Sequence, residues 1–410
     1  MSSGKSLSFG RYDHAAFLTF FAYAAGSVIV PVSLVELAGD LGFSLEDGGL
    51  TAGGALHFGR TVAMVVAMIF VGFIAGQWGT RRTLGYSVLL MTIGVFLCAL
   101  APTYGVLFLA LLLAGLGEGV IEGLATPFVQ NLHPQESGRY VNVTHAFWSI
   151  GVLVTVLMAG WLLDLEISWR VIVAVVAVVG GVAGLMILWP ASSQNAYPEV
   201  GKGVLWRTTF ARAVEILRFP RFWLYYAAMF LAGGGEFCLT FWSASHIQLH
   251  FAGSPFAGGL GVALFAFAMV IGRFACGVWV PQRHLTRAIL IAAVFGTAVT
   301  LGLPSASSLP LFYALLFAAG LATAPFWPSI QSDAADRIPQ MDGTMLLILL
   351  SCAGVPGCGV FAFLMGYLGN FSGSLSNTFY LVPFAYACIF LLIGVSHRLP
   401  SLAPSNHGSE

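Results

Sequence analysis

Long apolar segments recur along the whole 410-residue chain, and they constrain its fold more than any other feature. Each is close to the roughly 20 residues that an α-helix needs to cross the hydrocarbon core of a membrane. A helix satisfies its own backbone hydrogen bonds, and the apolar runs are continuous rather than alternating, which argues against a membrane β-barrel. Only 8% of the residues are charged, whereas soluble domains carry about 25%. The sequence therefore predicts an all-α membrane protein.

We predict twelve transmembrane helices. The first span is too long for a cleavable signal peptide, so we expect none. The predicted spans are Phe17–Leu37, Gly49–Ala75, Leu84–Ala101, Gly105–Gln130, Val141–Leu163, Val171–Trp189, Phe222–His246, Phe256–Val280, Ala288–Leu303, Leu309–Ile330, Thr344–Leu368 and Thr378–Ile393.

The positions of the basic residues predict the orientation. If the spans alternate, fourteen of the seventeen Lys and Arg residues fall on one side and only Arg170 on the other. Basic residues favour the cytoplasmic side, so both termini are predicted to be cytoplasmic, in the inner (plasma) membrane. The two remaining arginines, Arg60 and Arg273, lie inside spans. The six cysteines lie in apolar spans without a paired ligand motif, so we interpret them as packing residues.

A polar segment, residues 191–220, separates six spans from six. We predict an N-terminal bundle over 1–190, a cytoplasmic linker over 191–220 and a C-terminal bundle over 221–410. The halves resemble each other in several places; VGFIAGQWGTRR after the second span, for example, is echoed by IGRFACGVWVPQR after the eighth. Duplicated halves are typical of transporters, whose substrate site lies near the midplane between the repeats.

These motifs carry a family resemblance. The glycine-rich loop that ends in Arg81 and Arg82 resembles the major facilitator superfamily. Three stretches are similar to motifs of its fucose permease branch, whose members are sugar:proton symporters. They are IEGLATPFVQNLHPQESGRYVNVTHAFWSIG, IGRFACGVW and GGGEFCLTFW. The resemblance implies two pseudo-symmetric six-helix bundles, alternating access and proton coupling. The chain departs from the pattern at Gly76 and Ser27, where an aspartate is usual.

Two glutamates in the fourth span are the candidate proton-coupling residues. Glu122 matches the protonatable glutamate of the family, and desolvation favours the protonated form of a carboxyl group. The alternative is a hydrogen-bonded packing residue. Glu118 lies one turn earlier on the same face. We predict that Arg60 forms an ion pair with Glu118, which leaves Glu122 to titrate. Arg60 could instead bind an anionic substrate, because a guanidinium group can hold a carboxylate with two hydrogen bonds.

Other polar and aromatic residues inside spans are candidates for substrate binding, since such side chains usually face the interior. A packing role is the alternative for each. Glu236 follows three glycines that could let its helix bend or unwind. The candidate substrate-binding residues are Arg60, His57, Asn142, His145, Trp148, Glu236, Trp242 and Ser27, and the candidate structural or gating residues are Arg81, Arg82, Arg273 and Asp333.

We expect a secondary active transporter that couples protons to the symport of a small polar metabolite, either a sugar or an organic anion such as a sugar acid. Proton-driven efflux of drugs or metabolites is the alternative transport function, and a receptor that binds without transport is a further one. No metalloprotease or other paired catalytic motif points to an enzyme. The expected partners are the small-molecule substrate and the lipid bilayer, with no nucleic acid and no cofactor besides the coupling proton. We expect a monomer.

Overall fold

The computed structural model describes residues 8–135, 137–189, 196–199 and 206–399. Within these ranges it contains helices and loops, with no β-strand and with twelve helical segments long and apolar enough to cross a membrane. The predicted all-α class and the predicted number of spans are confirmed.

The spans of the first half are α1 (Arg11–Val32), α3 (Leu50–Trp78), α4 (Thr80–Leu100), α5 (Tyr104–Leu132), α6 (Ser137–Asp164) and α7 (Trp169–Leu188). Those of the second half are α9 (Pro220–Phe251), α10 (Pro255–Trp279), α11 (Leu285–Thr300), α12 (Leu309–Thr323) continued by α13 (Phe326–Arg337), α14 (Gly343–Ser372) and α15 (Leu381–Arg398). The shorter helices are α2 (Leu34–Asp40), η1 (Leu45–Gly49), α8 (Trp206–Leu217), η3 (Gln282–His284), η4 (Leu303–Ser305) and η5 (Ser376–Tyr380).

Prolines explain where two predicted spans are interrupted. The first was predicted to reach Leu37, but α1 ends at Val32, directly after Pro31, and α2 is a separate helix. The tenth span, predicted as Leu309–Ile330, breaks at Ala324 and Pro325, between α12 and α13. Proline lacks the backbone N–H that continues a helix and crowds the carbonyl four residues earlier.

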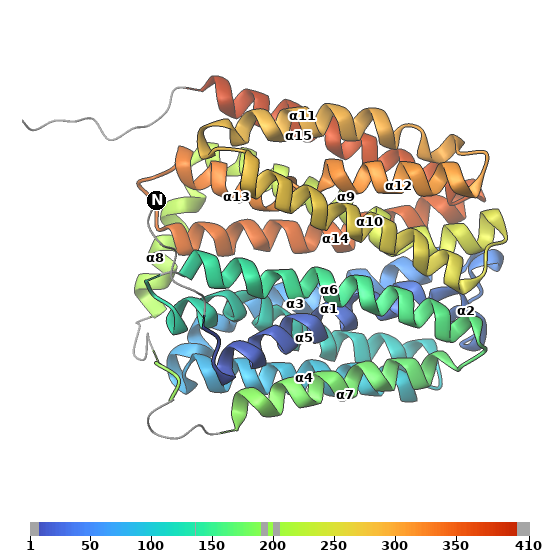
Figure 1. Cartoon of the computed structure of the whole chain (residues 1–410), viewed down its shortest axis with the longest axis horizontal. Helices are drawn as coiled ribbons and strands as arrows, with labels where there is room; N and C mark the ends of the chain where they lie inside the picture. The colour runs from blue at the N-terminus through green and yellow to red at the C-terminus, as the bar shows by residue number, and fades with distance from the viewer. Residues whose placement is uncertain (1–7, 136, 190–195, 200–205, 400–410) are drawn as a thin grey trace, which may run out of the picture.

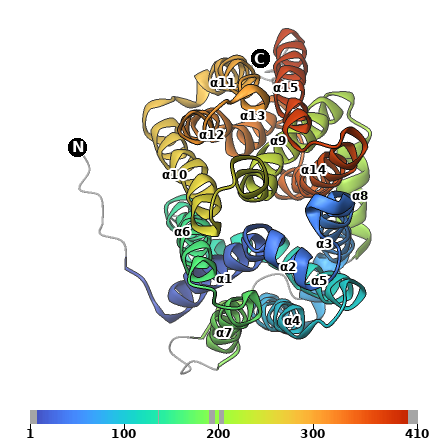
Figure 2. The same cartoon turned by 90° about the vertical axis from the view of Figure 1, so that its right-hand side faces the viewer.

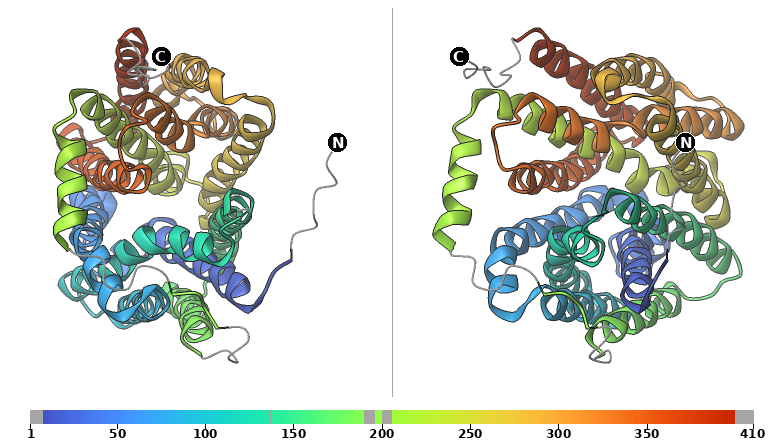
Figure 3. Two further views of the ribbon diagram at one scale, coloured as in Figure 1. Left: turned by 90° about the vertical axis from the view of Figure 1, so that its left-hand side faces the viewer. Right: turned by 60° about the vertical axis from the view of Figure 1, so that its left-hand side comes forward.

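The spanning helices run side by side along the longest axis of the molecule (Figure 1). We call the end that carries α8 the α8 end, and the opposite one the α2 end. Viewed from the α2 end, the helices of the first half lie together on one side and those of the second half on the other (Figure 2). Helix α8 lies across the α8 end and contacts both α3 and α14 (Figure 3).

The two halves meet along two equivalent seams. Helix α3 packs against α14, and α6 packs against α10. Each seam therefore joins the second span of one half to the fifth span of the other. This reciprocal pairing is what a duplicated six-helix unit produces, because a pseudo-two-fold axis exchanges the two seams.

Glycines bring the helix backbones close together at both seams. A Cβ atom on Gly54 of α3 would lie 2.7 Å from the carbonyl oxygen of Ala362, and one on Gly259 of α10 would lie 2.4 Å from that of Val156. Small residues permit such close approach between membrane helices. Asn370 of α14 adds hydrogen bonds to the start of α3 at the α2 end, where its side chain accepts from the backbone N–H of Leu50 (3.2 Å).

Candidate functional site

A pocket lies between the halves, near the middle of the bundle. Four helices contribute to it, α1 and α6 from the first half and α9 and α10 from the second. Most of its lining is apolar. The lining residues are Val28, Trp148, Ser149, Val152, Glu236, Phe237, Thr240, Val262, Phe265, Ala266, Met269 and Arg273.

Arg273 of α10 and Glu236 of α9 are the charged residues of this lining. The Arg273 Nη2 and Glu236 Oε2 atoms lie 3.5 Å apart, and the two side chains are 29% and 16% exposed. The Nε atom of Arg273 is buried without a hydrogen-bond partner. The sequence interpretation treated Arg273 as a structural residue near the end of its span and did not predict this pair. The structure places the guanidinium group at the pocket.

The three glycines before Glu236 do not bend or unwind α9, which is a continuous helix from Pro220 to Phe251. Instead they make room for neighbouring side chains. A Cβ on Gly234 would lie 2.5 Å from the ring of Phe361, and one on Gly235 would lie 2.4 Å from the ring of Tyr386. Their role is close packing against α14 and α15, which fixes the position of Glu236.

Trp148 connects the pocket to Glu122. Its ring contacts that of Tyr23, with centroids 4.5 Å apart, and the Tyr23 hydroxyl donates a hydrogen bond of 3.2 Å to Glu122 Oε2. Glu122 is half-buried. It does not line the pocket itself, but one aromatic side chain joins it to a residue that does.

His145 lies one turn before Trp148 on α6 and is exposed. Its Nε2 atom is 3.0 Å from the hydroxyl of Thr126, and its ring packs on Phe20 with centroids 4.7 Å apart. Beyond the pocket toward the α2 end, Trp242 is fully buried. These exposures indicate that the pocket is reached from the α8 end. The side chain of Asn142, a further candidate on this helix, is outside the described part of the structure.

Arg60 of α3 and Glu118 of α5 form the predicted ion pair. The Arg60 Nε atom donates to Glu118 Oε2 at 2.6 Å, and Arg60 Nη2 donates to Glu118 Oε1. The two side chains are 2% and 1% exposed. Arg60 Nη1 also donates to the carbonyl oxygen of Ser27 at 3.4 Å. That carbonyl is free to accept because Pro31, four residues later, has no N–H to bond to it.

Arg60 does not line the pocket between the halves. It borders a separate, tightly packed site with His57, and its charge is already matched by Glu118. This placement favours the structural alternative for Arg60 over substrate binding. Ser27 is buried and contributes its carbonyl group to the same cluster.

His57 and Trp242 are buried between helices rather than in the pocket. The His57 ring stacks on Phe237 of the other half, with centroids 4.7 Å apart, and its Nε2 atom is buried without a hydrogen-bond partner. Trp242 donates a hydrogen bond of 2.9 Å from Nε1 to the carbonyl of Ala362. The expectation that Trp242 lines the cavity is therefore wrong, because the close packing of α9 on α14 encloses it.

The candidate structural residues lie at the α8 end. Arg81 donates to the last carbonyl groups of α7, those of Ile187 and Leu188, at 2.9 Å each. Asp333 accepts hydrogen bonds of 2.6 Å from Tyr225 and from Thr286, and so ties α13 to α9 and α11. Arg82 is exposed. The sequence interpretation did not identify the partners of any of these residues.

A carboxylate does occupy the loop that begins α4, although Gly76 replaces the usual aspartate. It comes from Glu199 of the segment between the halves, which accepts a hydrogen bond of 2.7 Å from the backbone N–H of Thr80. Gly79, which precedes α4, has φ +85°, a conformation suited to glycine. Burial and, secondarily, the Glu199 charge raise the pKa of the nearby Tyr197 hydroxyl, which donates to the carbonyl of Phe128.

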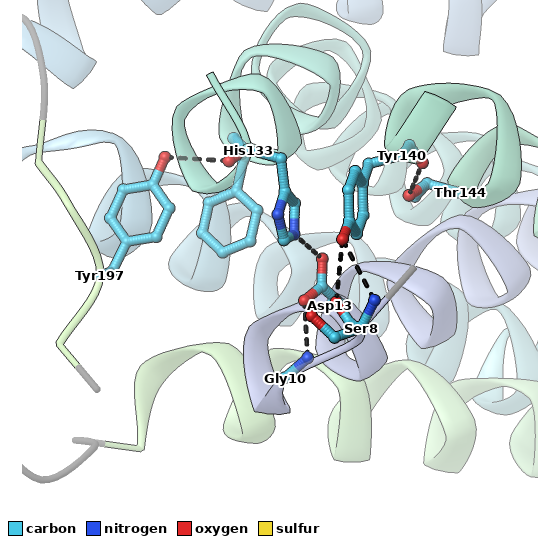
Figure 4. Close-up of polar contacts among 8 residues, drawn as sticks. Ser8, Gly10, Asp13, His133, Tyr140, Thr144 and Tyr197 are labelled. Atoms are coloured by element: carbon cyan, nitrogen blue, oxygen red, sulfur yellow. Dashed lines mark hydrogen bonds and ion pairs between the residues drawn. The ribbon is translucent and has the colours of Figure 1, made fainter. Parts of the chain in front are cut away.

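A second polar cluster at the α8 end joins the start of α1 to α5 and α6 (Figure 4). His133 Nε2 is 2.7 Å from Asp13 Oδ1, and the His133 ring stacks on Tyr140. The Tyr140 hydroxyl bonds the backbone of Ser8. Asp13 is buried, and the sequence interpretation did not identify it as a candidate.

A family model, Major Facilitator Superfamily, matches residues 15–345. The chain belongs to the Major Facilitator Superfamily. This match confirms the family predicted from the sequence motifs.

Other transporters of this superfamily share modest sequence identity with this facilitator. An uncharacterized MFS-type transporter of Mycobacterium tuberculosis is 31% identical over 148 residues, which are 36% of this chain and 20% of that protein. This chain therefore matches about a fifth of the length of that relative. A candidate multidrug resistance protein of Escherichia fergusonii, MdtD, is 22% identical over 91% of this chain and 90% of its own.

Solved structures of other facilitators share the fold. The nucleoside transporter NupG superposes with a TM-score of 0.73 at 14% identity, covering 95% of this chain and 99% of its own. The E. coli fucose:proton symporter FucP superposes with a TM-score of 0.62 at 16% identity, covering 94% and 98%. At these identities the likeness shows the fold of this facilitator and not its substrate.

Proposed function

We propose that this facilitator is a proton-coupled symporter for a small polar metabolite and that it works by alternating access. The observation that carries the proposal is the pocket between the two halves, bordered by the inter-half seam of α6 and α10 and by α1 and α9. A site in this position can open to either side when the halves rock against each other. Named neighbours of the fold include a sugar:proton symporter and a nucleoside transporter.

Glu122 is the proposed proton site. The nearby guanidinium group of Arg60 is already bound to Glu118, whereas Glu122 accepts a neutral hydrogen bond from Tyr23. A half-buried carboxyl group without a cationic partner can exchange a proton with water at the site. We further propose that the α8 end, both termini and the segment 191–220 face the cytoplasm, with the protein in the inner (plasma) membrane; the bias of Lys and Arg toward that side supports this orientation.

The test compares Glu122→Gln with the wild type in proteoliposomes. We expect the variant to lose accumulation driven by a proton gradient while it keeps exchange of substrate across the membrane, because exchange needs no net proton movement. Glu166→Gln, in the exposed connection between α6 and α7, is the matched control and should accumulate normally. Intact driven accumulation by Glu122→Gln would exclude this residue as the coupling site.

Efflux is a second candidate function. It is supported by the relative in Escherichia fergusonii that is named for multidrug resistance and by the mostly apolar lining of the pocket. Efflux by proton antiport predicts that an inward proton gradient drives substrate out of the liposomes, whereas symport predicts that the same gradient drives substrate in. The direction of driven flux, measured in liposomes of known protein orientation, separates the two functions.

A further inference from the structure

The two arginines that lie inside predicted spans of this facilitator, Arg60 and Arg273, differ in whether their hydrogen-bonding capacity is used. Arg60 is enclosed and its guanidinium fork is matched by both oxygens of Glu118. Arg273 faces the pocket, and its nearest carboxylate oxygen, on Glu236, is 3.5 Å away. That distance exceeds the 2.7–2.9 Å or so of a charge-assisted hydrogen bond. The second pair is therefore held by charge alone.

The free donors of Arg273 make its site incomplete. Its Nε atom is buried without any acceptor in the described part of the structure. A buried donor without an acceptor is costly and uncommon in folded proteins. An incoming group with two acceptor oxygens would satisfy the fork, as Glu118 does for Arg60.

From this contrast we propose that the substrate is a monocarboxylate with an apolar body, and that its carboxylate group displaces Glu236 from Arg273. This inference rests on the proposed function and names the class of substrate that the same pocket takes. Arg273 is the one cationic residue of the pocket lining, so the site neutralises one negative charge. Phe265, Met269 and Val152 provide an apolar wall for the rest of the molecule, and apolar side chains make up most of the lining.

Displacement leaves the carboxyl group of Glu236 without its cation in an enclosed site. A proton then binds to Glu236, because an uncompensated buried charge is unfavourable. The other ionisable groups that interact electrostatically with Glu236 are Arg273 of α10, Cys358 of α14 and Tyr386 of α15. Binding of a carboxylate is therefore accompanied by uptake of one proton at Glu236, which is separate from the proton that Glu122 exchanges during the transport cycle.

The test measures binding by purified protein in detergent, using calorimetry and ligand-induced thermal shift. The probes are phenylacetate and hexanoate, their neutral amides phenylacetamide and hexanamide, and the neutral sugar L-fucose. We expect both carboxylates to bind and the amides and sugar to bind at least about tenfold more weakly, since a charge-assisted pair is lost. Between about pH 6 and pH 8, where free carboxylates remain ionised, affinity for the carboxylates should rise as the pH falls.

Three variants identify the residues. Arg273→Gln should weaken carboxylate binding by about tenfold or more, and Arg273→Lys should restore part of it, because it keeps the charge and loses the fork. Glu236→Gln should bind carboxylates more tightly than the wild type at high pH and should lose the pH dependence. A gain in affinity cannot result from misfolding. Arg170→Gln, which removes a half-buried arginine paired with Asp40 outside the pocket, is the matched control for loss of a positive charge.

Unchanged carboxylate affinity in Arg273→Gln would overturn the inference, as would absence of binding by every carboxylate to monodisperse wild-type protein. The outcomes also separate this inference from the proposed function. Binding and proton-driven transport of L-fucose, independent of Arg273, would refute the carboxylate and leave the symporter standing. Carboxylate binding that depends on Arg273, with no substrate exchange in proteoliposomes, would uphold the site and refute transport.

Discussion

The buried pair of Arg60 and Glu118 leads to a stability prediction with an unequal outcome for its two partners. Two unit charges about 4 Å apart attract by about 4 kcal/mol at an effective dielectric constant of about 20. Because both side chains are almost fully buried, solvent does not screen this attraction. Removing either partner should therefore lower the free energy of unfolding by about 3–5 kcal/mol, the range measured when one member of a buried ion pair is removed.

The asymmetry comes from protonation. Arg60→Met leaves a carboxyl group, which can become neutral by taking up a proton, whereas Glu118→Gln leaves a guanidinium group, which stays charged at any accessible pH. The loss in Arg60→Met should consequently shrink as the pH is lowered toward the acidic range, and the loss in Glu118→Gln should not. The double variant Arg60→Met/Glu118→Leu removes both charges and should recover most of the stability, since apolar replacement of a buried pair is often neutral or better.

Reversible unfolding in mixed detergent micelles, at several pH values, measures these differences. The reasoning fails if either single variant loses less than about 1 kcal/mol, because a buried uncompensated charge must cost more than that. It also fails if the double variant is as unstable as the sum of the two singles, since that result would mean no coupling between the residues. Glu166→Gln serves as the control for removing an exposed carboxylate.

Two further predictions concern packing and helix capping. A Cβ on Gly119 of α5 would lie 2.1 Å from the carbonyl oxygen of Met64, so Gly119→Ala should destabilise the protein by about 1–3 kcal/mol in thermal unfolding. Gly105→Ala on the same helix is the control and should not destabilise it, because a Cβ there meets nothing within 4 Å. Equal stability of the two variants would contradict the packing argument. Glu199→Gln keeps an oxygen that accepts from the N–H of Thr80 but loses the negative charge at the start of α4. The unfolding free energy should therefore fall by about 0.3–1 kcal/mol, and by less at high salt. A loss of stability that does not depend on salt would show that the charge of Glu199 is not its cause.

Much of the fold could be predicted from local sequence because the bilayer imposes a simple rule on each segment. Apolar length marked twelve spans, and proline marked the break before α13. The glycines at 115, 119 and 123 predicted a close helix contact, and a Cβ on each of them would meet α3. The pairing of Arg60 with Glu118 followed from counting residues from the ends of neighbouring spans, which gives depth in a membrane.

The rest depended on which side of a helix faces which neighbour, and depth alone does not give this. Arg273 and Glu236 lie on consecutive spans, yet the sequence motif around Arg273 directed attention to the end of its helix. Trp242 was assigned to the cavity because aromatic residues often line sugar sites, but the approach of α14 encloses it. Glu199 is 119 residues away in the chain from Thr80, whose N–H donates to it, so no local sequence pattern predicts this contact.

The positions of the two ion pairs also bear on how the proposed alternating access can proceed. Arg60 and Glu118 both belong to the first half, and Arg273 and Glu236 both belong to the second, so each pair can move with its own half without breaking. Contacts that cross between the halves are of a different kind. Among the described residues they include close glycine packing at the two seams, the stack of His57 on Phe237, and the neutral hydrogen bonds of Asn370.

Neutral contacts of this kind can part and re-form without stranding a charge in a low-dielectric environment, which would be far more costly. The unfilled donors of Arg273 lie beside the inter-half space, so a bound carboxylate would also face α6 of the first half. A ligand that is bound by one half and also contacts the other half stabilises the conformation in which both halves contact it. The Arg60–Glu118 pair thus lies within one half, whereas Arg273, with its loosely paired guanidinium group, lies where the halves meet, which is where a charged substrate could bias their movement.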